Sequence, residues 1–146
     1  MTATLLYRIA AVLLILFAAA HTLGSLTFTP PTPEGVAVRD AMNNVHFQGY
    51  SYGNFYKGLA LSVTAYLLFL AFLAWHLGSV AAKTPEAIGA LGWIFCALHL
   101  ATLIVAAIYI AAVPAASAGV VGVCLGLAAW RVRAARPGSA TAATAA

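Results

Sequence analysis

Long apolar runs alternate with shorter polar segments along this chain. Four runs are long enough to cross a bilayer: about Leu5 to Phe28, Gly58 to Ala81, Ala87 to Val113, and Ala115 to Arg131. A transmembrane helix needs roughly 20 apolar residues to cross about 30 Å of hydrocarbon. The pattern therefore predicts an all-α fold, a four-transmembrane-helix bundle. Pro114 separates the last two runs, and the small residues 115–117 suit a tight hairpin between them.

The first run also has features of a signal peptide. It carries Arg8, the apolar stretch Ile9–Ala20 and small residues at 18–20. Its apolar character continues past Ala20 to Phe28, which fits a membrane span better than a signal peptide. We therefore expect this helix to be retained, and a mature N-terminus near His21 would overturn the four-span prediction.

The connection between the first two runs, from about Thr29 to Lys57, is the long one. It opens with an extended, proline-rich lead at 29–33. Residues Glu34 to His46 then predict a short helix with one apolar stripe, and Pro33 suits an early helical position. The long outer loop is thus expected to carry a short interfacial helix over the mouth of the bundle.

The stretch from His46 to Gly58 alternates aromatic residues with glycines and with Gln48, Ser51 and Asn54. One interpretation is an aromatic belt at the outer interface, with turns that lead into the second helix. The other is a loop that covers and contacts a ligand, because loops on rigid scaffolds often carry function. The sequence leaves both open.

Composition makes lipid the solvent for most of the chain. Of the 146 residues, 64% are hydrophobic and 7% are charged, whereas a soluble domain carries about 25% charged residues. The net charge of +4 comes without a basic patch interleaved with aromatics, so no nucleic-acid partner is expected. We expect one membrane domain over residues 1–136 and a disordered, uncharged C-terminal tail over residues 137–146.

Basic residues and tryptophans predict the orientation. With both termini in the cytoplasm, five basic residues lie inside (Arg8, Lys83, Arg131, Arg133 and Arg136) and two lie outside (Arg39 and Lys57). Trp75, Trp93 and Trp130 then all sit at the cytoplasmic interface, where such rings are enriched. The prediction is a multi-pass protein of the bacterial inner membrane with both termini cytoplasmic.

Three short motifs carry a family resemblance over the first half of the chain. They are His21-Thr22-Leu23-Gly24 at the end of the first run, Ala41-Met42 in the loop, and Gly49 with Phe55-Tyr56-x-Gly58 before the second run. The chain resembles a family of small, uncharacterised bacterial four-helix integral membrane proteins, and more loosely the architecture of DoxX-type proteins. The resemblance implies an all-helical membrane fold and no established activity.

Histidines inside the runs are the main candidates for chemistry, since ionisable residues in a membrane usually face the bundle interior. His21 and His99 would lie about 6 Å apart along the membrane normal, with His46 in the loop above them. A satisfied hydrogen bond to a neighbouring helix is the alternative for each, and for His76 beside Trp75 we expect interfacial anchoring. The predicted ligand-binding set is His21, His46, Tyr50, Tyr52, Asn54, Tyr56 and His99.

Cofactor and catalytic signals are weak. Two histidines on facing helices suffice for haem b, which stays open, whereas a zinc site would need four ligands at one depth. The chain has no HExxH, paired-carboxylate or GxSxG signature, so no catalytic residues are assigned. Cys96 and Cys124 are expected to be buried as small hydrophobes, and Gly122 with Gly126 allows either intrachain packing or a homodimer.

Two function classes remain. The preferred one is a non-catalytic binding or accessory protein with an outward-facing pocket for a lipid, quinone-like or other lipophilic small molecule. The alternative is a membrane oxidoreductase or electron-transfer protein that uses intramembrane histidines with haem or quinone.

Overall fold

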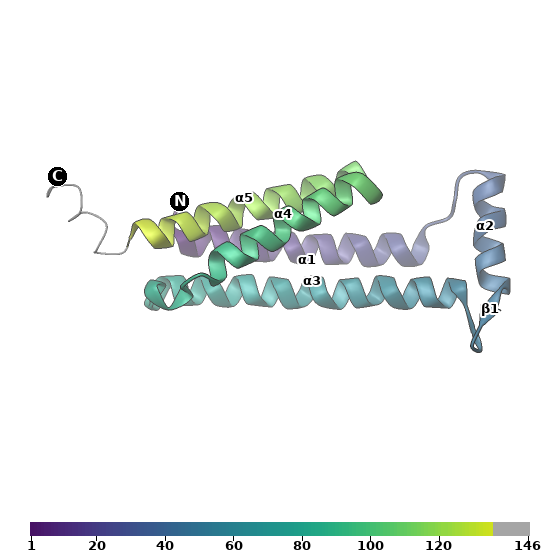
Figure 1. The fold of residues 1–146 in the computed structure, drawn as a ribbon, viewed down its shortest axis with the longest axis horizontal. Coiled ribbons are helices and arrows are strands. Elements are labelled where there is room, and N and C mark those ends of the chain that lie inside the picture. Colours follow the sequence, from purple (N-terminus) through teal and green to yellow (C-terminus); the bar gives the residue numbers. More distant parts are fainter. Residues whose placement is uncertain (136–146) are drawn as a thin grey trace, which may run out of the picture. The chain divides into compact units, whose positions relative to one another are not determined.

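The computed structural model describes residues 1–135, and these are almost entirely helical (Figure 1). Four helices are long and apolar enough to cross a membrane: α1 (Ala3–Thr27), α3 (Tyr52–Lys83), α4 (Leu91–Tyr109) and α5 (Ala112–Ala134). The all-α fold with four candidate spans is therefore confirmed, and the chain is a multi-pass membrane protein by the length and apolarity of these helices. The tail predicted over 137–146 lies outside the described residues.

The connection between α1 and α3 carries the predicted short helix, α2 (Pro33–Asn44). Thr32 caps it, because its hydroxyl accepts a hydrogen bond from the backbone N–H of Gly35 at 3.2 Å. Pro33 occupies the first turn, where a missing N–H removes no helical hydrogen bond. The helix ends at Asn44, two residues before the predicted end, because His46 already belongs to a β-strand.

A small hairpin follows, with β1 (His46–Phe47) paired antiparallel to β2 (Tyr50–Ser51). Its turn residues Gln48 and Gly49 both have positive φ, 48° and 84°. This is the turn geometry that matches the twist of a two-residue hairpin, and glycine adopts it without steric penalty.

The second span begins at Tyr52 rather than at the predicted Gly58. The hydroxyl of Ser51 accepts a hydrogen bond from the backbone N–H of Asn54 at 3.1 Å, as a helix-capping serine does. The aromatic stretch therefore forms the first turns of α3, and the ring of Phe47 packs against Tyr52 and Phe55 at centroid distances of 4.7 and 5.6 Å.

The third and fourth spans also differ from the prediction. A 3-10 turn, η1 (Pro85–Ile88), and Gly89 with φ of 56° precede α4, which begins at Leu91. The break before α5 falls at Ile110 and Ala111 rather than at Pro114. Pro114 lies in the first turn of α5, where backbone N–H groups have no helical partner to lose, so residues 115–117 are helical and the predicted hairpin there is wrong.

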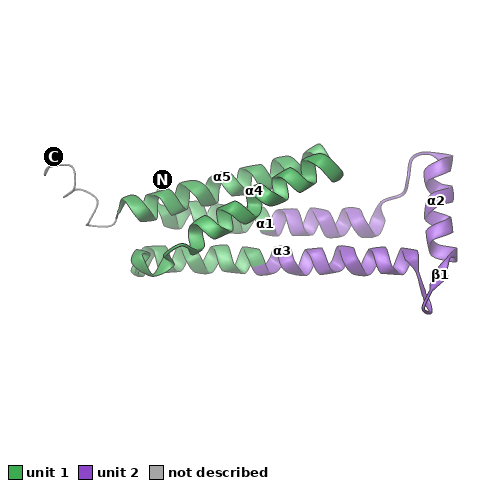
Figure 2. Cartoon of the chain, in the orientation of Figure 1, with its two compact units in different colours: residues 1–14, 70–146 green, residues 15–69 purple. Residues whose placement is uncertain are grey.

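The described chain forms two compact units (Figure 2). Unit 1 contains residues 1–14 and the chain from 70 onward, so all four long helices contribute to it. Unit 2 contains residues 15–69, that is, the second half of α1, α2, the hairpin and the first half of α3.

The core of unit 1 depends on glycines where α5 packs on α4. A Cβ at Gly126 would lie 3.1 Å from Cys96 Sγ, and one at Gly122 would lie 3.5 Å from His99 Cβ. The Cys96 thiol also donates to the carbonyl oxygen of Gly122 at 3.5 Å. Both glycines thus face α4 of their own chain, and dimerisation through them stays a prediction.

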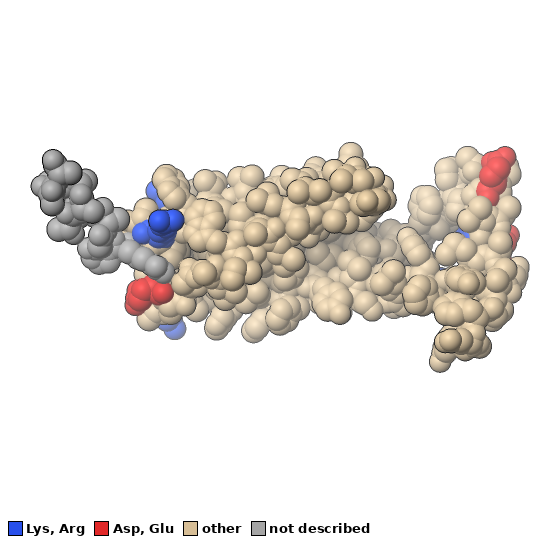
Figure 3. Space-filling view, in the orientation of Figure 1, with Lys and Arg blue, Asp and Glu red and all other residues tan. Residues whose placement is uncertain are grey.

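Charged side chains gather at one end of unit 1 (Figure 3). Two of its arginines lie over tryptophan rings. The Arg8 guanidinium lies 5.1 Å from the Trp75 ring centroid, and that of Arg131 lies 5.6 Å from the Trp130 ring centroid. Such stacking suits a membrane interface, where a cation and an amphipathic ring both find polar surroundings.

Candidate functional site

Unit 2 contains a cavity of about 590 Å³, called here the loop pocket. Its wall comes from the last turn of α1, the proline-rich lead, α2 and the first turns of α3. The wall mixes apolar, polar and charged residues, including Ser25, Leu26, Thr27, Phe28, Val38, Arg39, Asp40, Met42, Asn43, Tyr56 and Lys57. This size and mixed lining are typical of small-molecule sites.

Three glycines shape the loop pocket, in two ways. A Cβ at Gly35 would lie 2.7 Å from Pro30 Cβ, and one at Gly53 would overlap the Asn43 side chain, so both positions permit close packing. At Gly24, by contrast, a Cβ would have no neighbour within 4 Å. Gly24 therefore leaves space open, and packing does not require it.

The charges of the loop pocket are unevenly paired. Arg39 Nη2 lies 3.6 Å from Asp40 Oδ1, and these side chains are 43% and 56% exposed. Within residues 1–135, Lys57 has no ion-pair partner. The two cations and one carboxylate leave the wall with one net positive charge.

An apolar groove of about 420 Å³ runs along α1 and α3 within unit 2. Its wall contains Ile15, Ala18, Ala19, Leu23 and Leu68, together with Thr22 and Thr64. Leu26 and Thr27 belong to the walls of both the groove and the loop pocket. The two hollows therefore share part of their wall at the last turn of α1.

Polar contacts join α1 to α3 beside this groove. His21 Nε2 lies 3.1 Å from the carbonyl oxygen of Ala60, and because a carbonyl only accepts, Nε2 carries the proton. Thr22 Oγ1 lies 2.8 Å from both Thr64 Oγ1 and the Ala18 carbonyl oxygen. Thr64 Oγ1 also lies 3.2 Å from the carbonyl oxygen of Ala60, so its one proton goes either to that oxygen or to Thr22. When Thr64 donates to Thr22, Thr22 can still donate to Ala18.

His99 belongs to unit 1 and is 4% exposed. Its Nδ1 donates to the carbonyl oxygen of Phe95 at 3.1 Å, and the two rings meet edge to face at 5.0 Å. His21 belongs to unit 2. A ligand shared by the two stays a prediction.

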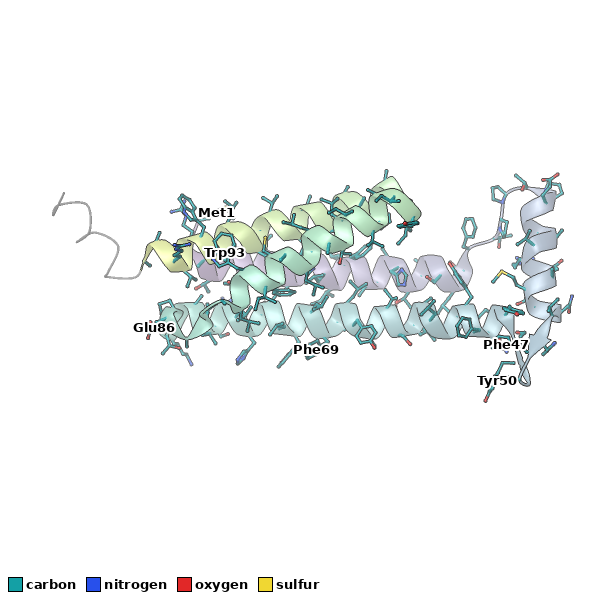
Figure 4. All side chains as sticks on the ribbon, in the orientation of Figure 1. Met1, Phe47, Tyr50, Phe69, Glu86 and Trp93 are labelled. Atoms are coloured by element: carbon teal, nitrogen blue, oxygen red, sulfur yellow. The ribbon has the colours of Figure 1, made fainter. Side chains whose placement is uncertain are left out.

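Among the predicted loop residues, Tyr56 lines the loop pocket. His46, Tyr50, Tyr52 and Asn54 are exposed and are not among its lining residues. Tyr50, 67% exposed, lies at the hairpin, shown with Phe47 in Figure 4. His46 Nδ1 donates to the carbonyl oxygen of Asn44 at 2.8 Å, so that ring helps to hold the loop.

The prediction of site residues did not include Gly24, Arg39, Asn43 and Lys57, which line the loop pocket, or the Thr22–Thr64 pair. The sequence does carry a signal for two of them, because Arg39 and Lys57 are the only basic residues of the long connection. The hydroxyl pair could not be found this way, since it depends on which faces of α1 and α3 meet.

The described chain contains no group of three His, Cys, Asp or Glu side chains placed to hold a metal ion. Haem needs only two ligands, and the hydrogen bonds above involve Nε2 of His21 and Nδ1 of His99, not the opposite nitrogen of either ring. Haem ligation stays a prediction that the absorbance spectrum of the purified protein tests directly.

Fold and pocket together define a class: an all-helical, multi-pass membrane protein with an open pocket beneath the connection between its first two spans. Comparisons of the chain with known protein families, with curated proteins and with solved structures find no match.

Proposed function

We propose that this chain is a membrane binding protein that holds a lipophilic ligand in the loop pocket. The observation that carries the proposal is the cavity of about 590 Å³, whose wall joins an apolar groove along two membrane-spanning helices. A ligand that partitions into the bilayer reaches such a pocket along the groove without crossing water.

Gly24 supports this function. Glycine inside a helix is less stable than alanine by about 1 kcal/mol, and nothing lies within 4 Å of a Cβ at this position. Packing therefore does not require glycine at this position. Its lack of a side chain leaves this part of the loop pocket wall open.

We place the protein in a bacterial inner membrane with both termini in the cytoplasm, as a member of the four-helix family that its motifs resemble. The distribution of cations along the spans supports this orientation. Lys83 lies in the last turn of α3, and Arg131 and Arg133 lie in the last turn of α5. Arg39 and Lys57 lie in α2 and the first turns of α3. Cations concentrate on the cytoplasmic side of membrane proteins. The loop pocket then opens outward.

Gly24→Leu tests the function, because the new side chain fills the loop pocket without meeting a backbone or side-chain neighbour at its Cβ. The matched control is Gly58→Leu, a helical glycine that also has no neighbour within 4 Å and does not line the loop pocket. The measurement is native mass spectrometry of each protein after incubation with a bacterial polar lipid extract.

We expect wild type and Gly58→Leu to retain a bound small molecule and Gly24→Leu to lose most of it. Equal retention by all three proteins would show that the loop pocket is not the binding site. Retention by none would refute lipophilic binding itself.

A further inference from the structure

We propose that the loop pocket and the groove form one site for a long-chain phosphate, an amphiphile with an anionic head and a hydrocarbon chain. The phosphate binds Lys57 and Arg39, and the chain lies in the groove between α1 and α3. This inference rests on the proposed function and specifies the ligand of the same site.

The charges of the loop pocket favour an anionic head. Lys57 on α3 and Arg39 on α2 come from two different elements, and both line the cavity. The Arg39–Asp40 contact of 3.6 Å is longer than a good hydrogen bond, so guanidinium N–H groups stay available to a phosphate. Asn43 and Tyr56 add neutral donors to the same wall.

The length of α3 places Lys57 at the level of lipid head groups. At 1.5 Å per residue, the 32 residues of α3 extend for about 48 Å, whereas the hydrocarbon core is about 30 Å thick. The terminal turns of α3 therefore reach the interfacial layers, and Lys57 lies in these first turns. Phosphates of membrane amphiphiles occupy the same layer.

The groove has the length and the apolar lining to hold the hydrocarbon chain of the ligand. On α1 its wall extends from Ile15 to Thr27, about 18 Å at 1.5 Å per residue. Ala18 and Ala19 hollow it between the larger Ile15 and Leu23. Leu26 and Thr27 line both the groove and the loop pocket, so the two hollows are neighbours, and we place the head and the hydrocarbon chain of one molecule in them.

A long-chain phosphate can come from two sources: a glycerophospholipid of the bilayer or an isoprenoid phosphate. Both combine the phosphate and the hydrocarbon that the site selects. The number and branching of their chains differ, so competition between them identifies the source.

The first experiment compares hexadecyl phosphate with hexadecanol as probes, which share a chain and differ in charge. Binding of each probe to the full-length protein in a neutral detergent is measured as the rise in the protein's unfolding temperature over a range of probe concentrations. We expect hexadecyl phosphate to bind at least tenfold more tightly, because a charge-assisted hydrogen bond is worth about one order of magnitude in affinity.

Lys57→Gln should weaken hexadecyl phosphate binding about tenfold, Arg39→Gln should weaken it similarly, and Lys57→Arg should restore it. Lys83→Gln is the control, since Lys83 is the other lysine of α3 and does not line the loop pocket. Hexadecanol binding should be the same in all four variants.

Equal binding of the two probes, with no effect of Lys57→Gln, would overturn the proposal that the site binds an anionic head group. Gly24→Leu would still separate this failure from that of the proposed function, because it blocks a neutral ligand as well. The source follows from displacing bound hexadecyl phosphate with phosphatidylglycerol or with an isoprenoid phosphate. Displacement by either supports the site, and displacement by neither would overturn its role in binding a membrane amphiphile.

Discussion

The polar residues within the spans show how this chain satisfies hydrogen-bonding groups in hydrocarbon. His21 donates through Nε2 to the Ala60 carbonyl oxygen, and the hydroxyls of Thr22 and Thr64 meet at 2.8 Å. Other hydroxyls bond within their own helix, as Ser62 does to Gly58 and Thr102 to Leu98. His21 and the Thr22–Thr64 pair, by contrast, join α1 to α3. These contacts hold together the two helices that form the walls of the groove.

His21→Ala should therefore lower the free energy of unfolding by about 1 kcal/mol, the usual size of an interhelical hydrogen bond in a membrane. His21→Gln should retain most of the stability, because an amide also donates to the Ala60 carbonyl. The measurement is unfolding by increasing SDS in mixed micelles. A His21→Ala protein as stable as wild type would show that this hydrogen bond does not hold α1 to α3.

Among the elements, the α4–α5 pair depends most closely on small residues. Gly122 and Gly126 bring α5 against His99 and Cys96, whereas a Cβ at Gly119 would meet Leu103 at an ordinary 3.7 Å. The same glycine spacing is common where two transmembrane helices associate. In this chain the partner helix is α4.

Gly126→Leu should destabilise the protein by about 1–3 kcal/mol, because the added side chain overpacks against Cys96. Gly119→Ala is the matched control and should be neutral or slightly stabilising, since alanine favours the helix and finds ordinary contact distance. SDS unfolding again reports the difference. If both variants were equally stable, α4 would not be packed on this face of α5.

For the whole molecule, the proposed orientation places the two ends of α3 on opposite sides of the membrane. Tyr50 precedes α3 and is 67% exposed, and the exposed Glu86 follows α3 in η1. Labelling at these two positions therefore reports on the two sides.

Single cysteines at these positions, introduced by Tyr50→Cys and Glu86→Cys in a background lacking Cys96 and Cys124, test the topology. A membrane-impermeant maleimide added to intact spheroplasts should label the cysteine at position 50. It should label the one at position 86 only after lysis. The reverse pattern would invert the orientation, and labelling of both in intact spheroplasts would refute the single crossing of the membrane by α3 between these two positions.

Much of the fold could be predicted because it depends on local properties. Apolar length predicted four spans, and the turn and stripe pattern predicted α2, which the structure places at Pro33–Asn44. The errors at element ends have local causes too. Ser51 caps α3 earlier than the aromatic-glycine stretch suggested, and Pro114 is tolerated in the first turn of α5.

Few of the residues that line the loop pocket could be predicted from the sequence. Histidines and tyrosines were chosen for their chemistry, and of these Tyr56 lines the loop pocket. Gly24 and Asn43 carry no chemical signal of a site, since their contribution is space and close packing.

The sequence by itself determined the membrane environment, the four spans and the helix in the long connection, because burial in lipid is set by the apolar length of each segment. The tertiary structure alone decided that the glycines of α5 face α4, that His21 meets Ala60, and that a pocket lies beneath the connection. Each of these depends on which faces of two helices meet, and that is a property of packing between segments distant in the chain.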